Sequence, residues 1–257
     1  MSGGGVVMLA GQGESTAIVY HALAKHFPID AVIVENAVAL TRLLMRRVRK
    51  IGPRRVFGQV LFGALACPYL RAEARRRSLE IKAQGDLDPS PIEEARLVRI
   101  PSVNSDEAIQ ALARLDPRVV VVNGTRIISR RTLASSPATF INMHAGVTPG
   151  YRGVHGAYWA LYEDNRHSCG VTVHVVDAGI DTGSILARAL IEPGARDNFV
   201  TYPLLQLAAG LPQLIGAVRN ALENRTQPLD VAPLPSKLWS HPTLWQYLHC
   251  RWRRGVR

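Results

Sequence analysis

The chain has 257 residues, of which 47% are hydrophobic, so it can bury a large core and is not a disordered segment. Its three cysteines, Cys67, Cys169 and Cys250, are odd in number and form no Cys-x-x-Cys pair, which argues against a disulfide framework and a structural zinc site. We therefore expect no metal. The formal charge of +11 favours an anionic partner: a phosphorylated small molecule, nucleic acid or an acidic membrane surface.

The chain shows no recognisable secretion signal, because MSGGGVVMLAG has no basic region and only a brief apolar run. A cytoplasmic location is the simplest expectation. The longest apolar segment, residues 56–70, is shorter than the roughly 20 residues of a membrane-spanning helix and is predicted to be a buried helix. Its flanks are basic: Arg42, Arg46, Arg47, Arg49, Lys50, Arg54 and Arg55 precede it, and Arg71, Arg75, Arg76 and Arg77 follow. These residues bind an anion or simply form solvated helix faces.

The first third of the chain alternates short apolar runs with helical patterns. Residues 6–10 (VVMLA) and 30–35 (DAVIVE) are predicted strands, separated by the turn GQGES and a helix over about 16–26. An Arg-rich helical region follows, which Gly52-Pro53 and Cys67-Pro68 should break or kink. The polar, proline-containing run at 84–95 is predicted to be a surface loop.

The middle of the chain repeats this alternation. Residues 97–101 (LVRIP) and a helix over 105–115 precede strands at 118–123 and 139–144, with a turn at 124–129 between the strands. Strands separated by helices predict an α/β fold with a mostly parallel twisted sheet and helices on both faces. Residues 197–222 are predicted to form one long helix interrupted by proline. We expect one domain over residues 1–225 and a Pro/Trp/Arg-rich C-terminal tail over 226–257.

Polar side chains end the strand at 139–144. Asn142 and His144 alternate with Met143, so they share one face, and the turn AGVTPGYRG places them at the carboxyl end of the strand, where ligands of α/β proteins bind. An Asn-x-His pair alone is a weak signal, because such residues often only satisfy backbone groups. The next strand, GVTVHVV, leads into a loop that carries Asp177 and Asp181 between glycines.

If Asp181 reaches His144, then an amide donor, a titratable imidazole and a carboxylate converge on one point. No serine or cysteine nucleophile has a matching setting. The arrangement suits direct transfer of an acyl group between two bound substrates, without a covalent enzyme intermediate.

The order N-x-H, P-x-Y-R-G and G-V-T-V-H-x-V-D-x-G-x-D-T-G resembles the formyltransferases that use 10-formyltetrahydrofolate. This family includes glycinamide ribonucleotide, methionyl-tRNA and sugar-nucleotide N-formyltransferases, and the likeness is strongest over residues 119–191. It implies a Rossmann-like fold, 10-formyltetrahydrofolate as cosubstrate and catalytic roles for Asn142, His144 and Asp181. In these roles Asn142 and a protonated His144 stabilise negative charge on the formyl oxygen. Asp181 holds His144 and takes the amine proton through water.

The resemblance also implies that backbone groups of two loops hold the folate ring. The candidate contacts are Gly124, Thr125, Arg126, Ile127, Ile128, Asp177, Ala178, Gly179 and Ile180. His174 either lines this loop or makes an ordinary structural hydrogen bond. Arg152 either pairs with a phosphate or with neighbouring carboxylates.

The turn GQGES resembles the phosphate-binding turn of glycinamide ribonucleotide formyltransferases, but Glu14 adds a charge that would repel phosphate. A tight turn without ligand is the alternative. The candidate acceptor contacts are Gly11, Gly13, Ser15, Tyr151, Arg152 and His155. Tyr151, Tyr158, Trp159 and Trp245 are candidates to stack on a base, although helix-spaced aromatic residues such as Tyr158 and Trp159 more often pack in a core.

The acceptor is expected to be a small anionic amine, and an amino sugar nucleotide fits best. The last 60 or so residues lack the alternating strands of a tRNA-binding barrel, which disfavours tRNA. Glycinamide ribonucleotide or another small amine is the alternative acceptor. Two other hypotheses are a folate-binding protein without activity and a membrane-surface enzyme that formylates a lipid-linked amine. The basic flanks motivate a peripheral membrane contact, and a homodimer is left open.

Overall fold

A seven-stranded sheet organises the chain, in a computed structural model that describes residues 4–231 and 235–257. Its strands lie in the order β3-β2-β1-β4-β5-β7-β8, and a separate pair joins β6 to β9. The strands are β1 (Val6–Ala10), β2 (Ile29–Glu35), β3 (Leu97–Ile100), β4 (Val119–Asn123), β5 (Thr139–His144), β6 (Arg152–Gly153), β7 (Gly170–Val175), β8 (Ile185–Leu190) and β9 (Leu238–Trp239).

The sheet is mostly parallel. Strands β1 to β5 run parallel to one another, whereas β7 is antiparallel to β5 and β8 is antiparallel to β7. The chain order reverses between β1 and β4, because β2 and β3 lie on one side of β1 and β4 and β5 on the other. The crevice beyond the carboxyl ends of strands at such a reversal is the usual ligand site of this fold class.

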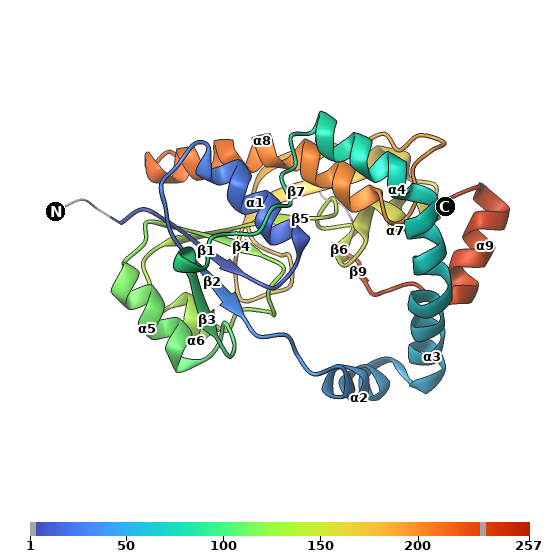
Figure 1. Cartoon of the computed structure of the whole chain (residues 1–257), viewed down its shortest axis with the longest axis horizontal. Coiled ribbons are helices and arrows are strands. Elements are labelled where there is room, and N and C mark those ends of the chain that lie inside the picture. The colour runs from blue at the N-terminus through green and yellow to red at the C-terminus, as the bar shows by residue number, and fades with distance from the viewer. Residues whose placement is uncertain (1–3, 232–234) are drawn as a thin grey trace.

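Helices cover both faces of the sheet, as predicted (Figure 1). The helical segments are α1 (Glu14–Ala24), α2 (Leu40–Ile51), α3 (Pro53–Leu61), the π turn η1 (Phe62–Ala66), α4 (Cys67–Gln84), η2 (Glu94–Arg96), α5 (Asp106–Leu115), α6 (Arg130–Leu133), α7 (Gly156–Tyr162), η3 (Arg166–Ser168), α8 (Tyr202–Leu222) and α9 (Leu244–Arg254). None of the helices described is long and apolar enough to cross a bilayer.

Alternating strand residues build two cores. Met8 of β1 points to the face covered by α1 and α8, where it packs with Ile18 and Leu214. Its neighbour Leu9 points to the opposite face and packs with Leu112 of α5. This two-sided burial explains why β1 and β4 consist almost entirely of apolar residues.

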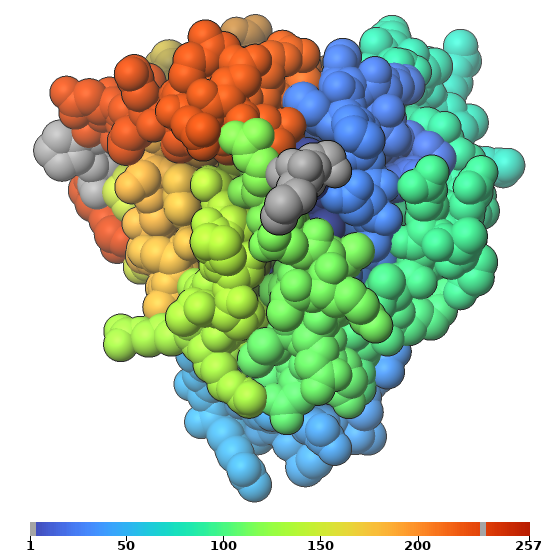
Figure 2. Space-filling view, turned by 90° about the vertical axis from the view of Figure 1, so that its left-hand side faces the viewer, coloured from blue at the N-terminus to red at the C-terminus, as the bar shows by residue number. Residues whose placement is uncertain are grey.

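The Arg-rich region forms α2, α3 and α4, of which α2 and α3 project from the sheet layers whereas α4 packs beside α8 (Figure 1). Gly52 adopts a positive φ of 82° between α2 and α3, so the predicted break at Gly52-Pro53 is confirmed. At Cys67-Pro68 no loop interrupts the helical rod, which passes from α3 through the π turn η1 into α4. Pro68 lacks an N–H for the preceding turn, and the π turn is the irregularity that lies directly before it. In Figures 1 and 2 the blue segment around residue 50 lies at the lower end of the molecule.

A third core joins this rod to the C-terminal segment. Phe62 and Leu70 pack with Tyr158 of α7 and with Tyr247 and Cys250 of α9. The prediction that residues 56–70 form a buried helix is therefore only half right, since Phe57, Val60, Leu65 and Tyr69 on its other side are exposed. Tyr158 is a core residue, as is Trp159.

Two further boundaries differ from the sequence prediction. Helix α8 begins only at Tyr202, because Asn198 and Thr201 form a hydrogen-bonded turn before it, and Pro212 lies inside the helix without ending it. Residues after 225 include β9 and α9, so the C-terminal tail contributes ordered elements that pack on the rest of the chain.

Candidate active site

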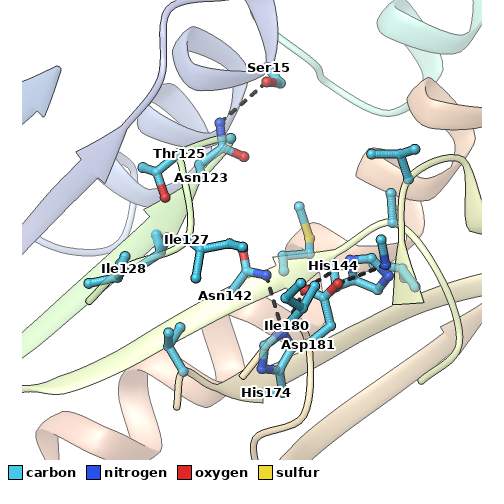
Figure 3. A pocket seen from close by; sticks show the side chains of 18 of the residues that line it. Ser15, Asn123, Thr125, Ile127, Ile128, Asn142, His144, His174, Ile180 and Asp181 are labelled. Carbon is cyan, nitrogen blue, oxygen red and sulfur yellow. Dashed lines mark hydrogen bonds and ion pairs between the residues drawn. The ribbon is translucent and has the colours of Figure 1, made fainter. Parts of the chain in front are cut away.

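The carboxyl end of β5 carries the first two site residues. Asn142 pairs with His174 of β7 across the antiparallel ladder, and His144 pairs with Thr172. Because residues two apart share a strand face, Asn142, His144 and His174 project together (Figure 3). Thr172 fixes the next turn, since its hydroxyl accepts a hydrogen bond of 3.1 Å from the N–H of Thr148.

His144 is buried between two acceptors, with 6% of its surface exposed. Its Nε2 lies 2.8 Å from the carbonyl oxygen of Tyr151, and its Nδ1 lies 3.4 Å from Oδ1 of Asp181. A carbonyl oxygen can only accept, so Nε2 must carry a proton. Nδ1 faces the carboxylate of Asp181, so both ring nitrogens of His144 are directed at protein oxygens.

Asp181 is held by the turn that follows β5. Its Oδ2 accepts a hydrogen bond of 2.9 Å from the N–H of Gly153, and its backbone adopts a left-handed φ of 52°. A guanidinium nitrogen of Arg152 donates to the carbonyl oxygen of Ile180 at 3.2 Å. Arg152 therefore fastens the two loops together. It makes no ion pair with a carboxylate within the described residues, and the phosphate alternative stays a prediction.

His174 makes the structural hydrogen bond that the sequence analysis allowed, and also contacts Asn142. Its Nδ1–H donates to the carbonyl oxygen of Val175 at 2.8 Å, so Nε2 bears the lone pair and accepts from the Asn142 amide at 3.1 Å. Burial lowers the pKa of His174, which keeps it neutral although Oδ1 of Asp181 lies 3.8 Å from Nε2. Sequence reasoning missed His174 as the group that orients Asn142.

These groups border a cavity of about 750 Å³, large enough for a small cofactor. Figure 3 shows Asn142, His144 and Asp181 on one side and Thr125, Ile127 and Ile128 on another. The lining includes every predicted folate contact except Ala178, namely Gly124, Thr125, Arg126, Ile127, Ile128, Asp177, Gly179 and Ile180. Asn142, His144 and Asp181 thus converge on one cavity, as the sequence analysis required.

Buried Glu35 at the end of β2 supports the 124–128 loop. Its carboxylate accepts from the N–H of Arg126 at 2.7 Å and from the N–H of Val103 at 3.1 Å, and pairs with the Arg126 guanidinium at 3.3 Å. The sequence analysis missed this supporting role of Glu35. The available signal was a single acidic residue at the end of an apolar strand.

The turn after β1 packs against β4. A Cβ on Gly11 would lie 2.3 Å from the carbonyl oxygen of Gly124, so the close approach of the two turns requires glycine here. Asn123 donates to the hydroxyls of Thr16 at 3.0 Å and Ser15 at 3.3 Å. Of the three predicted acceptor contacts in this turn, Ser15 lines the cavity, whereas Gly11 and Gly13 do not.

The other predicted acceptor contacts divide in the same way. Tyr151 is buried away from the cavity: its hydroxyl donates to Glu163 and its ring stacks on Trp239. His155 lines the cavity and lies 2.9 Å from His241 through ring nitrogens. Burial, then His241 and Arg47, lower the pKa of His155 to about 3, and burial and Arg47 lower that of His241 to about 4.

No cluster of three or more histidine, cysteine or acidic residues able to hold a metal occurs within residues 4–231 and 235–257. In the same ranges all three cysteines are free thiols.

Comparison with known proteins identifies the family. Residues 75–202 match the formyl transferase family model. This segment, about half of the chain, belongs to the formyl transferase family. The matched segment begins in α4 and ends at the start of α8, so it contains both loops and the three converging residues Asn142, His144 and Asp181.

Individual relatives include different members of this formyl transferase family. A methionyl-tRNA formyltransferase from Desulfotalea psychrophila is 32% identical over 146 residues, which cover 52% of this chain and 44% of the relative. Glycinamide ribonucleotide transformylase 1 from Symbiobacterium toebii superposes with a TM-score of 0.56 at 20% identity, covering 90% of this chain and 96% of that one. The chain spans less than half the length of the curated relative.

A third comparison involves a ligand complex. The N-formyltransferase from Helicobacter canadensis, solved with folinic acid and dTDP-3-aminofucose, superposes with a TM-score of 0.54 at 14% identity, covering 91% of this chain and 70% of that one. These superpositions establish a shared Rossmann-like fold.

Proposed function

We propose that this chain is an N-formyltransferase that moves a formyl group from 10-formyltetrahydrofolate to the primary amine of a small anionic acceptor. The observation that carries the proposal is the convergence of Asn142, His144 and Asp181 on one side of a cavity of about 750 Å³. In this assignment residues 1–225 form the catalytic domain and residues 226–257 a C-terminal segment that packs on it.

The folate is assigned to the two loops that line the cavity. The 124–128 loop offers backbone groups and two isoleucines, Ile127 and Ile128, while the loop at 177–183 brings Asp177 and Ile180. A flat ring with polar edges fits a slot with apolar walls and backbone donors and acceptors. The complex of the Helicobacter canadensis enzyme with folinic acid supports this choice of cosubstrate.

Transfer begins when the neutral amine attacks the formyl carbon, and negative charge then develops on the formyl oxygen. One N–H of the Asn142 amide is engaged by His174, which leaves the other to donate to this oxygen. Both ring nitrogens of His144 face protein oxygens, so neither is free to donate to the formyl oxygen, and we assign a protonated His144 the role of stabilising the negative charge electrostatically. A single donor aimed at the developing oxyanion is typically worth a few kcal/mol.

Proton transfer completes the reaction. Asp181 is the nearest carboxylate, and through a water molecule it can accept the proton of the attacking amine. The bond between the formyl carbon and N10 of the folate then breaks, and N10 receives a proton as it leaves. No covalent bond to the protein forms at any step.

An amino sugar nucleotide is our first choice of acceptor. The cationic side chain of Arg47 is close enough to His155 and His241 to lower the pKa of both, and His155 lines the cavity, so positive charge lies near the cavity where an anionic acceptor would bind. The presence of dTDP-3-aminofucose in the Helicobacter canadensis complex supports this class. Glycinamide ribonucleotide is the smaller alternative.

Methionyl-tRNA is a second candidate, which the sequence analysis disfavoured. The 32% identity with the Desulfotalea psychrophila methionyl-tRNA formyltransferase favours it, and so do the basic residues of α2. The identity covers only the shared catalytic segment, so it supports the formyl donor more strongly than the acceptor.

The test is a direct assay of transfer. The full chain is incubated with 10-formyltetrahydrofolate and, separately, with amino sugar nucleotides, glycinamide ribonucleotide and methionyl-tRNA, and mass spectrometry measures the acceptor. We expect one acceptor to gain one formyl group. Folate binding without transfer to any acceptor amine would instead identify a folate-binding protein.

A further inference from the structure

Exposed apolar side chains are concentrated at one end of the molecule. Ten of the fifteen exposed large hydrophobic residues in the described ranges lie on α2, α3, η1, the start of α4 and α9. We call this set the α2–α9 surface: Leu40, Met45, Val48, Phe57, Val60, Leu65, Tyr69, Trp245, Leu248 and Trp252. Since α3 contacts both α2 and α9, the elements are neighbours at this end of the chain (Figure 1).

Helix α2 has an apolar side that the described chain covers only in part, since Leu44 is half-buried while Leu40 and Val48 are exposed. Leu40, Leu44 and Val48 recur every four residues, whereas Arg42, Arg46 and Arg49 lie on the opposite side. None of the twelve residues of α2 is buried. An amphipathic helix normally buries its apolar side against a core, so α2 lacks its expected partner.

Helix α9 has two apolar faces: one is buried in the fold, and on the other the Trp245 ring packs against the chain, next to Gly58 of α3. Tyr247 and Cys250 point into the third core. Trp245, Leu248 and Trp252, spaced three and four residues apart, form a stripe on the opposite side. Leu248 is 53% exposed and Trp252 80% exposed, so this stripe faces outward.

The charge around these side chains is mostly positive, with Glu73 beside Arg251 as an exception. Residues 36–72 contain no aspartate or glutamate and eight basic residues: Arg42, Arg46, Arg47, Arg49, Lys50, Arg54, Arg55 and Arg71. Within the described ranges, none of these eight makes an ion pair. On α9, Arg253 lies 5.4 Å from the ring of Trp252, and Arg251 lies 5.9 Å from the ring of Tyr69 on α4.

We propose that the α2–α9 surface docks this chain on a membrane surface rich in anionic phospholipids. Leucine, valine and tryptophan side chains enter the boundary between headgroups and acyl chains, and the surrounding arginines contact the lipid phosphates. Nucleic acid would use the arginines but offers no apolar phase for Leu40, Val48 and Leu248. A second copy of the chain would bring equal positive charge against the same surface, which opposes association.

Vesicle flotation with the full chain tests the docking. We expect the protein to float with vesicles of phosphatidylglycerol and phosphatidylcholine at low salt, and to stay in solution with phosphatidylcholine alone. The variant Leu248→Ser/Trp252→Ser and the variant Arg42→Gln/Arg46→Gln/Arg49→Gln should each lower the partition coefficient at least about tenfold. Absence of binding to the anionic vesicles at low salt overturns the proposal.

Matched controls separate this surface from general properties of the chain. Leu190→Ser removes an equally exposed leucine elsewhere, and Arg114→Gln/Arg130→Gln/Arg166→Gln removes three exposed arginines far from α2 along the chain. Both controls should bind as the unmodified protein does, and all variants should show its circular dichroism spectrum. Equal losses in variants and controls also overturn the proposal.

Two other outcomes would assign the surface to another partner. If Arg42→Gln/Arg46→Gln/Arg49→Gln loses RNA binding while Leu248→Ser/Trp252→Ser floats normally, the surface binds nucleic acid. If analytical ultracentrifugation shows a dimer that Leu248→Ser/Trp252→Ser abolishes, the surface is an interface between copies. Either result overturns membrane docking.

Discussion

The amide nitrogen of Asn142 lies 3.1 Å from Nε2 of His174, directly across the ladder between β5 and β7. The Nδ1–H of His174 is committed to the carbonyl oxygen of Val175, so Nε2 can only accept. This relationship selects one of the two orientations of the Asn142 amide and directs its NH₂ group toward the site. His174 is therefore a positioning residue for the proposed oxyanion donor.

Replacing this histidine should affect the chemical step more than binding. In His174→Leu the Asn142 amide loses its acceptor and can rotate, so we expect kcat to fall roughly tenfold to a hundredfold with KM nearly unchanged. His174→Gln retains a side-chain oxygen that can accept from Asn142 and should recover part of kcat. A loss shared equally by both variants would mean that the histidine acts in another way.

Asn142→Asp tests the donor itself. The carboxylate of this variant would have the same shape as the amide but no N–H to donate. It would also place a negative charge next to the formyl oxygen, on which negative charge develops in the proposed reaction. We expect kcat to fall by about 10²–10³ while the thermal unfolding midpoint changes little, since Asn142 is only partly buried. Near-normal turnover of formyl transfer by this variant would remove Asn142 from the mechanism.

Much of the fold was predictable because it depends on local patterns. Apolar runs at 6–10, 30–35 and 118–123 are strands buried on both faces, and such runs carry a clear signal. The spacing of Asn142 and His144 likewise placed them on one face. That Asp181 would meet His144 came from the family resemblance, and the structure brings their atoms to 3.4 Å.

What the sequence did not predict depends on long-range contacts. Tyr151 follows a turn near the site, yet its ring packs on Trp239, almost ninety positions later in the chain. Glu35 at the end of β2 and Arg126 after β4 are far apart in the sequence, and only the fold brings them into contact. The open side of α2 also could not be predicted, because an amphipathic pattern reveals an apolar side without telling whether anything covers it.

The His155–His241 pair should make folding stability depend on pH. Both pKa values are lowered in the fold, to about 3 and about 4, relative to an ordinary value of 6.5. As the pH falls below 6.5, the unfolded chain binds protons that the folded chain does not. The free energy of unfolding therefore decreases as the pH falls from 6.5 to about 4 and below. Two such groups give a slope of at most about 2.7 kcal/mol per pH unit.

The measurement is urea unfolding between pH 7.5 and 4, compared with the variant His155→Asn/His241→Gln. Asparagine is chosen at 155 because it tolerates the left-handed φ of 59° found there. The variant should lose part of the dependence on pH over this range. An identical pH profile in both proteins would show that the two imidazoles do not titrate differently in the folded and unfolded states.

Gly183 closes the loop that carries Asp181, and its replacement tests whether that loop is positioned precisely. A Cβ at this position would lie 1.7 Å from the carbonyl oxygen of Val175, so Gly183→Ala must displace the backbone at the end of β7. We expect a destabilisation of about 1–3 kcal/mol and a fall in kcat of at least tenfold, because Asp181 shifts away from His144. The matched control is Gly216→Ala in α8, where a Cβ would meet nothing within 4 Å. This variant should keep full activity, and its free energy of unfolding should be unchanged or higher by up to about 1 kcal/mol. Normal turnover in Gly183→Ala alongside the expected loss of stability would show that the position of Asp181 does not limit the reaction.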